Sequence, residues 1–181
     1  QMKDGSTTSF IGRSNFTFDG QQFTIDCSNF RLSQFSVAVG EDAGQTNQGA
    51  SAVAVGPQAG QTDQSKNAVA VGSFAGQTTQ RRHAVAVGNY AGNSSQGTSA
   101  VAVGFFAGQT DQSKNAIAVG SHAGQTTQGI DSVAIGNYAG QTTQGASAVA
   151  VGNYAGQTDQ SNNAIAIGNF AGNSAQKSSS V

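Results

Sequence analysis

The sequence predicts an all-β fold, a parallel β-solenoid (β-roll) of nine 16-residue coils preceded by an amino-terminal β cap. A string close to AVAVGNYAGQTTQ, followed by three variable residues, recurs nine times from Val37 onward without insertion or deletion. One glycine register of period 16 starts at Gly40, and a second starts four residues later at Gly44. Such a short and rigid period indicates coils that stack on one another, so that equivalent residues form columns along the solenoid axis.

The composition is that of an ordered repeat with little charge. The 181 residues are 36% hydrophobic and 9% charged, and the formal net charge is -1. Low charge with a fixed glycine period argues against disorder, and a net charge near zero gives no expectation of steering toward nucleic acid or an anionic membrane. No apolar run approaches the roughly 20 residues of a membrane-spanning helix. Cys27 is the single cysteine, so we expect a small buried hydrophobe and no internal disulfide framework.

Residues 1–36 differ from the array of residues 37–181 and hold six of the ten Phe residues. We interpret them as a β cap that covers the end of the array; a separate small domain is the alternative, although about 36 residues rarely bury enough surface to fold alone. Val181 falls in the column of Val37, so we expect the chain to stop at the start of a tenth coil. The cap is predicted from apolar pairs with one polar residue between them, seven residues apart, at Phe16/Phe18, Phe23/Ile25 and Phe30/Leu32.

Within a coil, the first leg alternates two kinds of apolar residue, as in Val133, Ala134 and Ile135. We expect Val and Ile to fill the interior of the coil and the alanine face to need a cover, because strands apolar on both faces are usually covered on both sides. A second copy of the chain is the natural cover, so a homo-oligomer, most simply a side-by-side trimer, is predicted. Lys66 and Arg82 are neighbours in one column, and like charges so close are tolerable only in water, which places the closing loop on an outer rim.

Two columns are candidate sites. Stacked side-chain amides about 4.8 Å apart can form a structural hydrogen-bonded ladder. Stacked rings could seal a corner or an oligomer interface, or could form an exposed strip that binds glycan or protein. The amide column contains Gln48, Gln64, Gln80, Gln96, Gln112, Gln128, Gln144, Gln160 and Gln176. The ring column contains Phe74, Tyr90, Phe106, His122, Tyr138, Tyr154 and Phe170.

Residues typical of catalysis are sparse. His83 and His122 lie in different columns, so neither a metal pair nor a His-based triad is predicted. Asp63, Asp111 and Asp159 share a column three coils apart, about 14 Å on the solenoid spacing, which is too far for paired-carboxylate catalysis. The glycine-rich turns lack the lysine of a phosphate loop. We expect no enzyme activity, no metal and no cofactor.

The strings SAVAVGPQAG, NAVAVGSFAG, NAIAVGSHAG and NAIAIGNFAG resemble the head repeats of YadA-type trimeric autotransporter adhesins. They are also similar to repeats in fibre and surface proteins of large DNA viruses and phages. The resemblance covers residues 36–181 and implies a left-handed β-roll, with three chains packed side by side and displayed at a surface for attachment. The coil here is longer than the adhesin repeat by a GQTxQ leg.

Together these observations favour a structural and attachment module of an extracellular, cell-surface or virion-surface fibre. Nine coils would form a stiff rod about 43 Å long at roughly 4.8 Å per coil. The expected partners are other copies of the chain and, through multivalent contacts, surface glycan or protein. Binding to nucleic acid and membrane insertion are not expected. The alternative is an ice-binding solenoid, since flat columns of Thr can organise water, although only one such rank is present. That rank contains Thr46, Thr62, Thr78, Thr110, Thr126, Thr142 and Thr158, with Ser94 and Ser174 in its gaps.

Overall fold

The computed structural model describes residues 15–18, 23–26 and 36–181, and the chain divides into two units, residues 1–33 and 34–181. In the first unit, β1 (Asn15–Phe18) and β2 (Phe23–Asp26) pair antiparallel, as the two Phe-containing pairs predicted. The third apolar pair, Phe30/Leu32, and Cys27 lie outside the described residues. That this unit caps the array stays a prediction.

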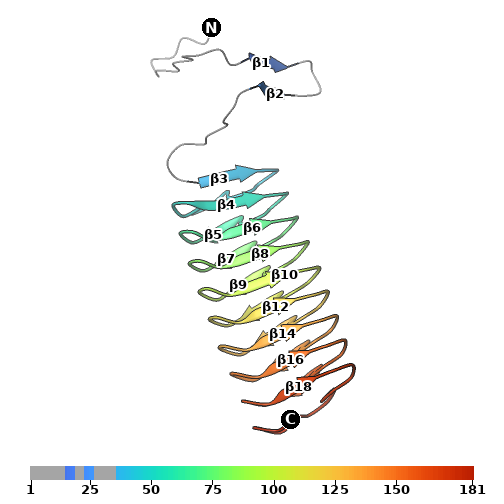
Figure 1. Cartoon of the computed structure of the whole chain (residues 1–181). Helices are drawn as coiled ribbons and strands as arrows, with labels where there is room; N and C mark the ends of the chain where they lie inside the picture. The colour runs from blue at the N-terminus through green and yellow to red at the C-terminus, as the bar shows by residue number, and fades with distance from the viewer. Residues whose placement is uncertain (1–14, 19–22, 27–35) are drawn as a thin grey trace. The chain divides into compact units, whose positions relative to one another are not determined.

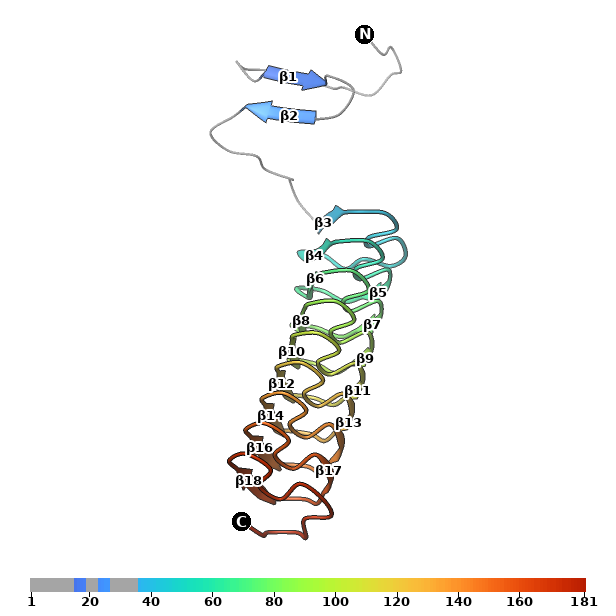
Figure 2. The same cartoon turned by 90° about the vertical axis from the view of Figure 1, so that its right-hand side faces the viewer.

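The second unit is a solenoid built from two parallel sheets, and the described residues contain no helix. The coils succeed one another in sequence order (Figures 1 and 2). The first sheet has nine strands: β3 (Ser36–Val39), β4 (Ala52–Val55), β6 (Val69–Val71), β8 (Val85–Val87), β10 (Val101–Val103), β12 (Ile117–Val119), β14 (Val133–Ile135), β16 (Val149–Val151) and β18 (Ile165–Ile167). The second has seven: β5 (Thr62–Gln64), β7 (Thr78–Gln80), β9 (Ser94–Gln96), β11 (Thr110–Gln112), β13 (Thr126–Gln128), β15 (Thr142–Gln144) and β17 (Thr158–Gln160).

The register of both sheets follows the sequence period. Val101 pairs with Ile117 and Ala102 with Ala118, each partner lying one coil further along the chain. In the second sheet Gln112 pairs with Gln128 in the same way. Columns in the sequence are therefore columns in space, which confirms the predicted parallel β-solenoid.

Each coil closes through two tight corners of the same kind. In residues 56–59 the amide of the fourth residue donates to the carbonyl of the first at 3.1 Å, and the third residue, Gln58, has φ of 55°. Residues 65–68 repeat this arrangement at 3.2 Å, with φ of 60° at Asn67. A positive φ at the third position is the mark of a type II turn, and Pro57 occupies the second position, where proline is favoured.

The first glycine register is required by the close approach of successive coils. Gly88 has φ of 128°, and a Cβ built on it would lie 2.5 Å from the carbonyl oxygen of Gly104. Any side chain in this column would therefore push two coils apart. This close contact accounts for the glycines from Gly40 to Gly152, whereas Gly168 shares the positive φ, at 122°, but a Cβ on it would meet only the Ala171 Cβ at 3.9 Å.

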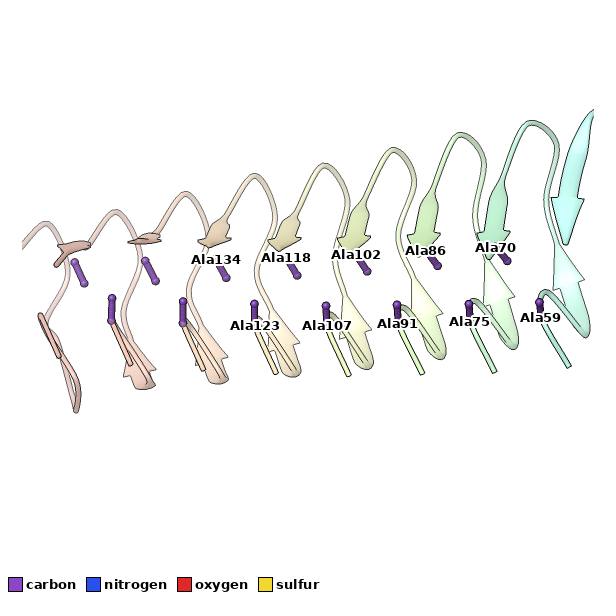
Figure 3. Packing of buried hydrophobic residues seen from close by; sticks show 14 of the residues in the cluster. Ala59, Ala70, Ala75, Ala86, Ala91, Ala102, Ala107, Ala118, Ala123 and Ala134 are labelled. Atoms are coloured by element: carbon purple, nitrogen blue, oxygen red, sulfur yellow. The ribbon is translucent and has the colours of Figure 1, made fainter. Parts of the chain in front are cut away.

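The interior of the solenoid is lined by alanine, and the prediction that Val and Ile fill it was wrong. Ala102 and Ala107 are fully buried, whereas Val101 and Val103 are only half-buried and point away from the core. Figure 3 shows alanines of the first sheet, such as Ala102, facing alanines at the end of the following corner, such as Ala107, and this pair repeats along the axis.

The reason for the reversal is the width of the coil. The larger apolar side chains usually lie inside, but the buried side chains here are alanine methyl groups, one glutamine from each coil and Ser132. A Cβ added at Gly108 would already lie 2.8 Å from the amide carbon of Gln112. A branched side chain has no room there, so the Val and Ile side chains are left on the outer face.

Candidate functional site

The glutamine column forms a hydrogen-bonded ladder inside the solenoid. Gln112 donates from Nε2 to the Val101 carbonyl oxygen at 2.7 Å and to Gln128 Oε1, in the next coil, at 3.1 Å. The ladder thus ties the two sheets of one coil together and links each coil to the next. No buried side-chain N or O atom among the described residues lacks a hydrogen-bond partner. The fully buried members are Gln64, Gln80, Gln96, Gln112, Gln128, Gln144 and Gln160.

The second glycine register leaves room for the glutamine side chains of this ladder. Gly108 has φ of 50°, and the space its missing side chain leaves is filled by the amide group of Gln112. The same glycine and glutamine, four residues apart, meet in every coil from Gly44 and Gln48 onward. The GQTxQ leg is therefore one packing unit, and its role is structural.

A second amide ladder, which the sequence analysis missed, lies partly exposed on the same leg. Gln141 Nε2 donates to Gln125 Oε1 at 3.0 Å, and Gln157 Nε2 donates to Gln141 Oε1 at 3.0 Å. It donates toward the preceding coil, whereas the buried ladder donates toward the following one. The available signal was the glutamine directly after each second-register glycine, replaced only by Asn93 and Asn173.

The ring column is a continuous stack. The ring centroids of Tyr138 and Tyr154 are 5.0 Å apart with an interplanar angle of 4°, and the other neighbouring pairs are 4.6 to 5.4 Å apart. Each interior ring is covered on both faces by its neighbours, so it offers an edge and not a face to the surroundings. The stacked members are Phe74, Tyr90, Phe106, His122, Tyr138, Tyr154 and Phe170.

This geometry limits what the ring column can bind. A sugar ring is generally recognised by packing its C–H face on the face of an aromatic side chain. In this column the faces of the interior rings are already covered by the neighbouring rings. Phe170, at the end of the stack, is 54% exposed. Phe105 is 47% exposed and lies beside the middle of the stack, with its ring edge-on to Phe106 and His122. The stack is well suited to rigidify the corner, and surface binding by it stays a prediction.

The two outward columns of the first sheet make an apolar surface, here called the Val/Ile face. It consists of the first and third residues of each VAV-type strand, for example Val101 and Val103. The side chains are half-buried, and Val39, Ile135 and Ile167 are 54%, 40% and 67% exposed. The face contains no charged residue along nine parallel strands, so it is a continuous apolar surface of the kind that marks an interaction site.

The second sheet presents the threonine rank. Thr62 pairs with Thr78, and Thr110 pairs with Thr126, each one coil apart. Thr78 and Thr126 are exposed, while the other two are half-buried. The rank is single, because the next residue toward the rim is a mixture of Asp, Thr, Ser, Asn and Ala with positive φ.

The closing loops lie on the outer rim, as the Lys66 and Arg82 column predicted. Both side chains are exposed, and so are those of Arg81, His83 and Lys114. His122 belongs to the ring stack, where its Nδ1 lies 2.9 Å from the Ser121 hydroxyl oxygen. The structure keeps the two histidines apart, as expected from their columns.

Within the described ranges, no group of three or more His, Cys, Asp or Glu residues is arranged to hold a metal ion. No helix long and apolar enough to cross a membrane was found there either. Comparison with family models, with curated proteins and with solved structures gave no match.

Proposed function

We propose that this chain is a structural and attachment module of an extracellular, cell-surface or virion-surface fibre. The observation that carries the proposal is that the Val/Ile face, the threonine rank and the ring column each repeat one kind of side chain from coil to coil, in register. A contact that is weak at one coil is thereby presented many times on one rigid body. Multivalent presentation raises the strength of attachment far above that of a single contact. The resemblance to adhesin head repeats supports the same setting.

The module is proposed to act as a homo-oligomer, most simply a trimer, assembled through the Val/Ile face. A second copy of the chain is still proposed as the cover, but the face that it covers is the one formed by Val and Ile and not the one formed by alanine. Exposed apolar patches of this regularity mark interaction surfaces. In a trimer the Val/Ile face of each chain would lie toward the threefold axis and contact both neighbouring chains. Parallel association would place Val101 and Val103 of neighbouring chains against one another.

Light scattering on the purified protein tests the assembly. The wild-type mass is expected to be a multiple of the single-chain mass, three times for a trimer. Val119→Lys places a charge in the middle of the Val/Ile face and should release single chains, because a buried unpaired charge opposes association. Thr98→Lys adds the same charge on the rim, where Lys66 and Lys114 already occur in its column, and should leave the mass unchanged. A single-chain mass for the wild type would overturn the proposed assembly.

Attachment is tested by coating beads with either protein and counting beads retained on intact cells under flow. At a coating too sparse for neighbouring molecules on a bead to bind together, the wild type should be retained, and Val119→Lys should be retained less, because an oligomer presents the outward columns of several chains and a single chain presents one set. Equal retention of both proteins would contradict the multivalent mechanism, and no retention of either would contradict attachment to that surface.

A second candidate, ice binding, is favoured by one observation, the in-register threonine rank on the second sheet. Its test is inhibition of ice recrystallisation at micromolar protein. The matched variants are Thr126→Lys, within the rank, and Val119→Lys, on the other sheet. Activity abolished by the first substitution alone would replace attachment with ice binding as the function; no activity in the wild type removes this candidate.

A further inference from the structure

The charges of the solenoid are unevenly distributed along its axis. Residues 36–181 contain five Lys or Arg residues and six Asp or Glu residues, so the array as a whole is almost neutral. Four of the five cations nevertheless lie between residues 66 and 114, and residues 64–110 contain no acidic residue. One stretch of the rim is therefore positively charged, although the net charge of the chain is -1.

The cations of this stretch are stacked by the solenoid period. Lys66, Arg82, Thr98 and Lys114 occupy one column, and Arg81 lies in the column beside it. All four cations are exposed. Within residues 36–181 no hydrogen bond or ion pair joins their charged groups to another side chain. They are free to contact an anion.

A hollow of about 440 Å³ lies in this part of the rim. Arg81 and Lys114 contribute to its lining from coils two steps apart, about 10 Å along the axis at the strand spacing. The residues that bear on its chemistry are Arg81, Thr98, Asp111, Ser113, Lys114 and Ile130.

The hollow is a built feature of the coils. Gly97 lines it and occupies the position between Arg81 and Ser113 in their column. A Cβ added at Gly97 would lie 2.4 Å from the backbone carbon of Ser113. The backbones of the two coils are therefore in close contact there, and this position of the lining carries no side chain.

We propose that this hollow binds an acidic sugar residue, one carrying a carboxylate or a sulfate, of a surface glycan. The inference rests on the proposed attachment function and names the partner class. Arg81 and Lys114 match the anionic group. Asp111, Thr98 and Ser113 match the ring hydroxyls, which need both acceptors and donors, and Ile130, 51% exposed, offers an apolar contact for the C–H side of a ring. The volume lies within the range of small-ligand sites.

The lining favours a sugar over nucleic acid. A single-stranded nucleic acid is generally held by a basic groove together with aromatic side chains on which bases stack, and the hollow is lined by no aromatic residue. Asp111 would also repel the regularly spaced phosphates of a nucleic acid, whereas an acidic sugar carries its anionic group at one place and can turn its ring hydroxyls toward the Asp111 carboxylate.

Calorimetric titration of the wild-type protein at about 0.15 M salt tests the proposal. The probes are 3′-sialyllactose, sulfated lactose, neutral lactose and a thymidine oligonucleotide. At least one acidic sugar should bind saturably, and lactose should bind at least about tenfold more weakly. Arg81→Ser and Lys114→Thr should each weaken the acidic sugar about tenfold or more, since each removes a charged hydrogen-bond donor. Both replacements introduce residues that the same columns hold elsewhere, at Ser113 and Thr98.

Two further variants separate a sugar site from a simple charge effect. Lys177→Ser removes a cation from the column of Arg81 six coils away and should leave binding unchanged. Asp111→Thr, a residue that Thr127 provides in the same column, should weaken the sugar but strengthen a bare polyanion. The proposal would be overturned if neither acidic sugar bound saturably, or if Lys177→Ser weakened the acidic sugar as much as Arg81→Ser does. Tighter binding of the acidic sugar by Asp111→Thr would also overturn it, in favour of a nucleic acid or other polyanion.

The bead assay distinguishes this failure from failure of the proposed function. If Arg81→Ser beads are retained like wild-type beads while acidic sugars do not bind, the sugar site is wrong and attachment stands. If acidic sugars bind but neither wild-type nor variant beads are retained, the site stands and the attachment function fails.

Discussion

Positive φ angles are unusually frequent in each coil, and most of them are not at glycine. In the coil of residues 101–116, the five such residues are Gly104, Phe106, Gly108, Asp111 and Asn115. Asn and Asp tolerate this conformation through their short polar side chains, but an aromatic residue pays about 1–2 kcal/mol for it. A stacked aromatic pair contributes about 0.5–1.5 kcal/mol, so a ring with two neighbours can offset its own strain. A ring in this column is therefore stabilised by its stacked neighbours, and a single ring without them would only add strain.

Substitutions at Tyr138 test this balance. Tyr138→Ala loses both stacked neighbours and keeps the strain, so we expect a loss of about 1–3 kcal/mol in the free energy of unfolding. Tyr138→Gly loses the same contacts but relieves the strain, and should be about 1 kcal/mol more stable than the alanine variant. Urea denaturation of the two variants measures the difference. A glycine variant less stable than the alanine variant would show that the φ of 57° does not hold in solution.

The two amide ladders should differ in their contribution to stability. Gln112→Leu leaves the Val101 carbonyl and the amides of Gln96 and Gln128 short of a partner in a dry interior, and should cost about 3 kcal/mol or more. Gln141→Leu breaks the half-buried ladder, where water replaces the lost amide, and should cost less than about 1 kcal/mol. Thermal and urea unfolding compare the two. Equal losses would contradict the assigned difference in burial.

At the scale of the strand, the two faces should respond oppositely to added carbon atoms. Ala102→Val overfills the closed interior and should lower the free energy of unfolding by about 1–3 kcal/mol. Val103→Ile adds carbon on the outer face, in a column that already contains Ile135 and Ile167, and should change it by less than about 0.5 kcal/mol. Denaturant midpoints at one protein concentration make the comparison. A tolerated Ala102→Val would mean that the interior is wider than described.

The strand pattern could be predicted from the sequence, but which face is inside could not be predicted from residue size. Alternation of Val101, Ala102 and Val103 defines two faces, and the usual preference for burying the larger side chain selects the wrong one. The deciding quantity is the distance between the two legs, which depends on Gln112 crossing the interior. The sequence does contain a signal for the buried face. The middle residue of the strand is alanine in every coil, whereas the first and third residues are either Val or Ile, and a closed interior tolerates no added carbon atom.

The candidate sites were predictable to the extent that they are columns. A fixed period places the rings of Phe74 to Phe170 and the buried glutamines in line, and the structure shows both stacks. The hollow at Gly97 was not predictable, because it depends on which side chains are absent from neighbouring coils and how far the flanking ones reach. The register of residues places Gly97 between Arg81 and Ser113, but it does not give the reach of the flanking side chains.

At the scale of the whole molecule, the fold should tolerate the deletion of one whole coil but not the deletion of part of a coil. Deleting residues 104–119 removes one period and rejoins every column, so the protein should fold with an unchanged circular dichroism spectrum per residue and a modest loss of stability. Deleting residues 104–111, half a period, places glycine registers opposite strands and should abolish cooperative unfolding. Circular dichroism during heating tests both. A folded half-period variant would contradict the need for column register.

The hydrogen bonds along the axis run in both directions. The buried ladder donates from Gln112 to Gln128, and the outer ladder from Gln141 back to Gln125. The backbone alternates likewise, Val101 donating to the next coil and Gly104 to the preceding one. Their electric dipoles therefore oppose one another, unlike those of an α-helix, whose alignment leaves about half a charge at each end. A solenoid of this kind can gain coils by duplication without building up charge at its ends.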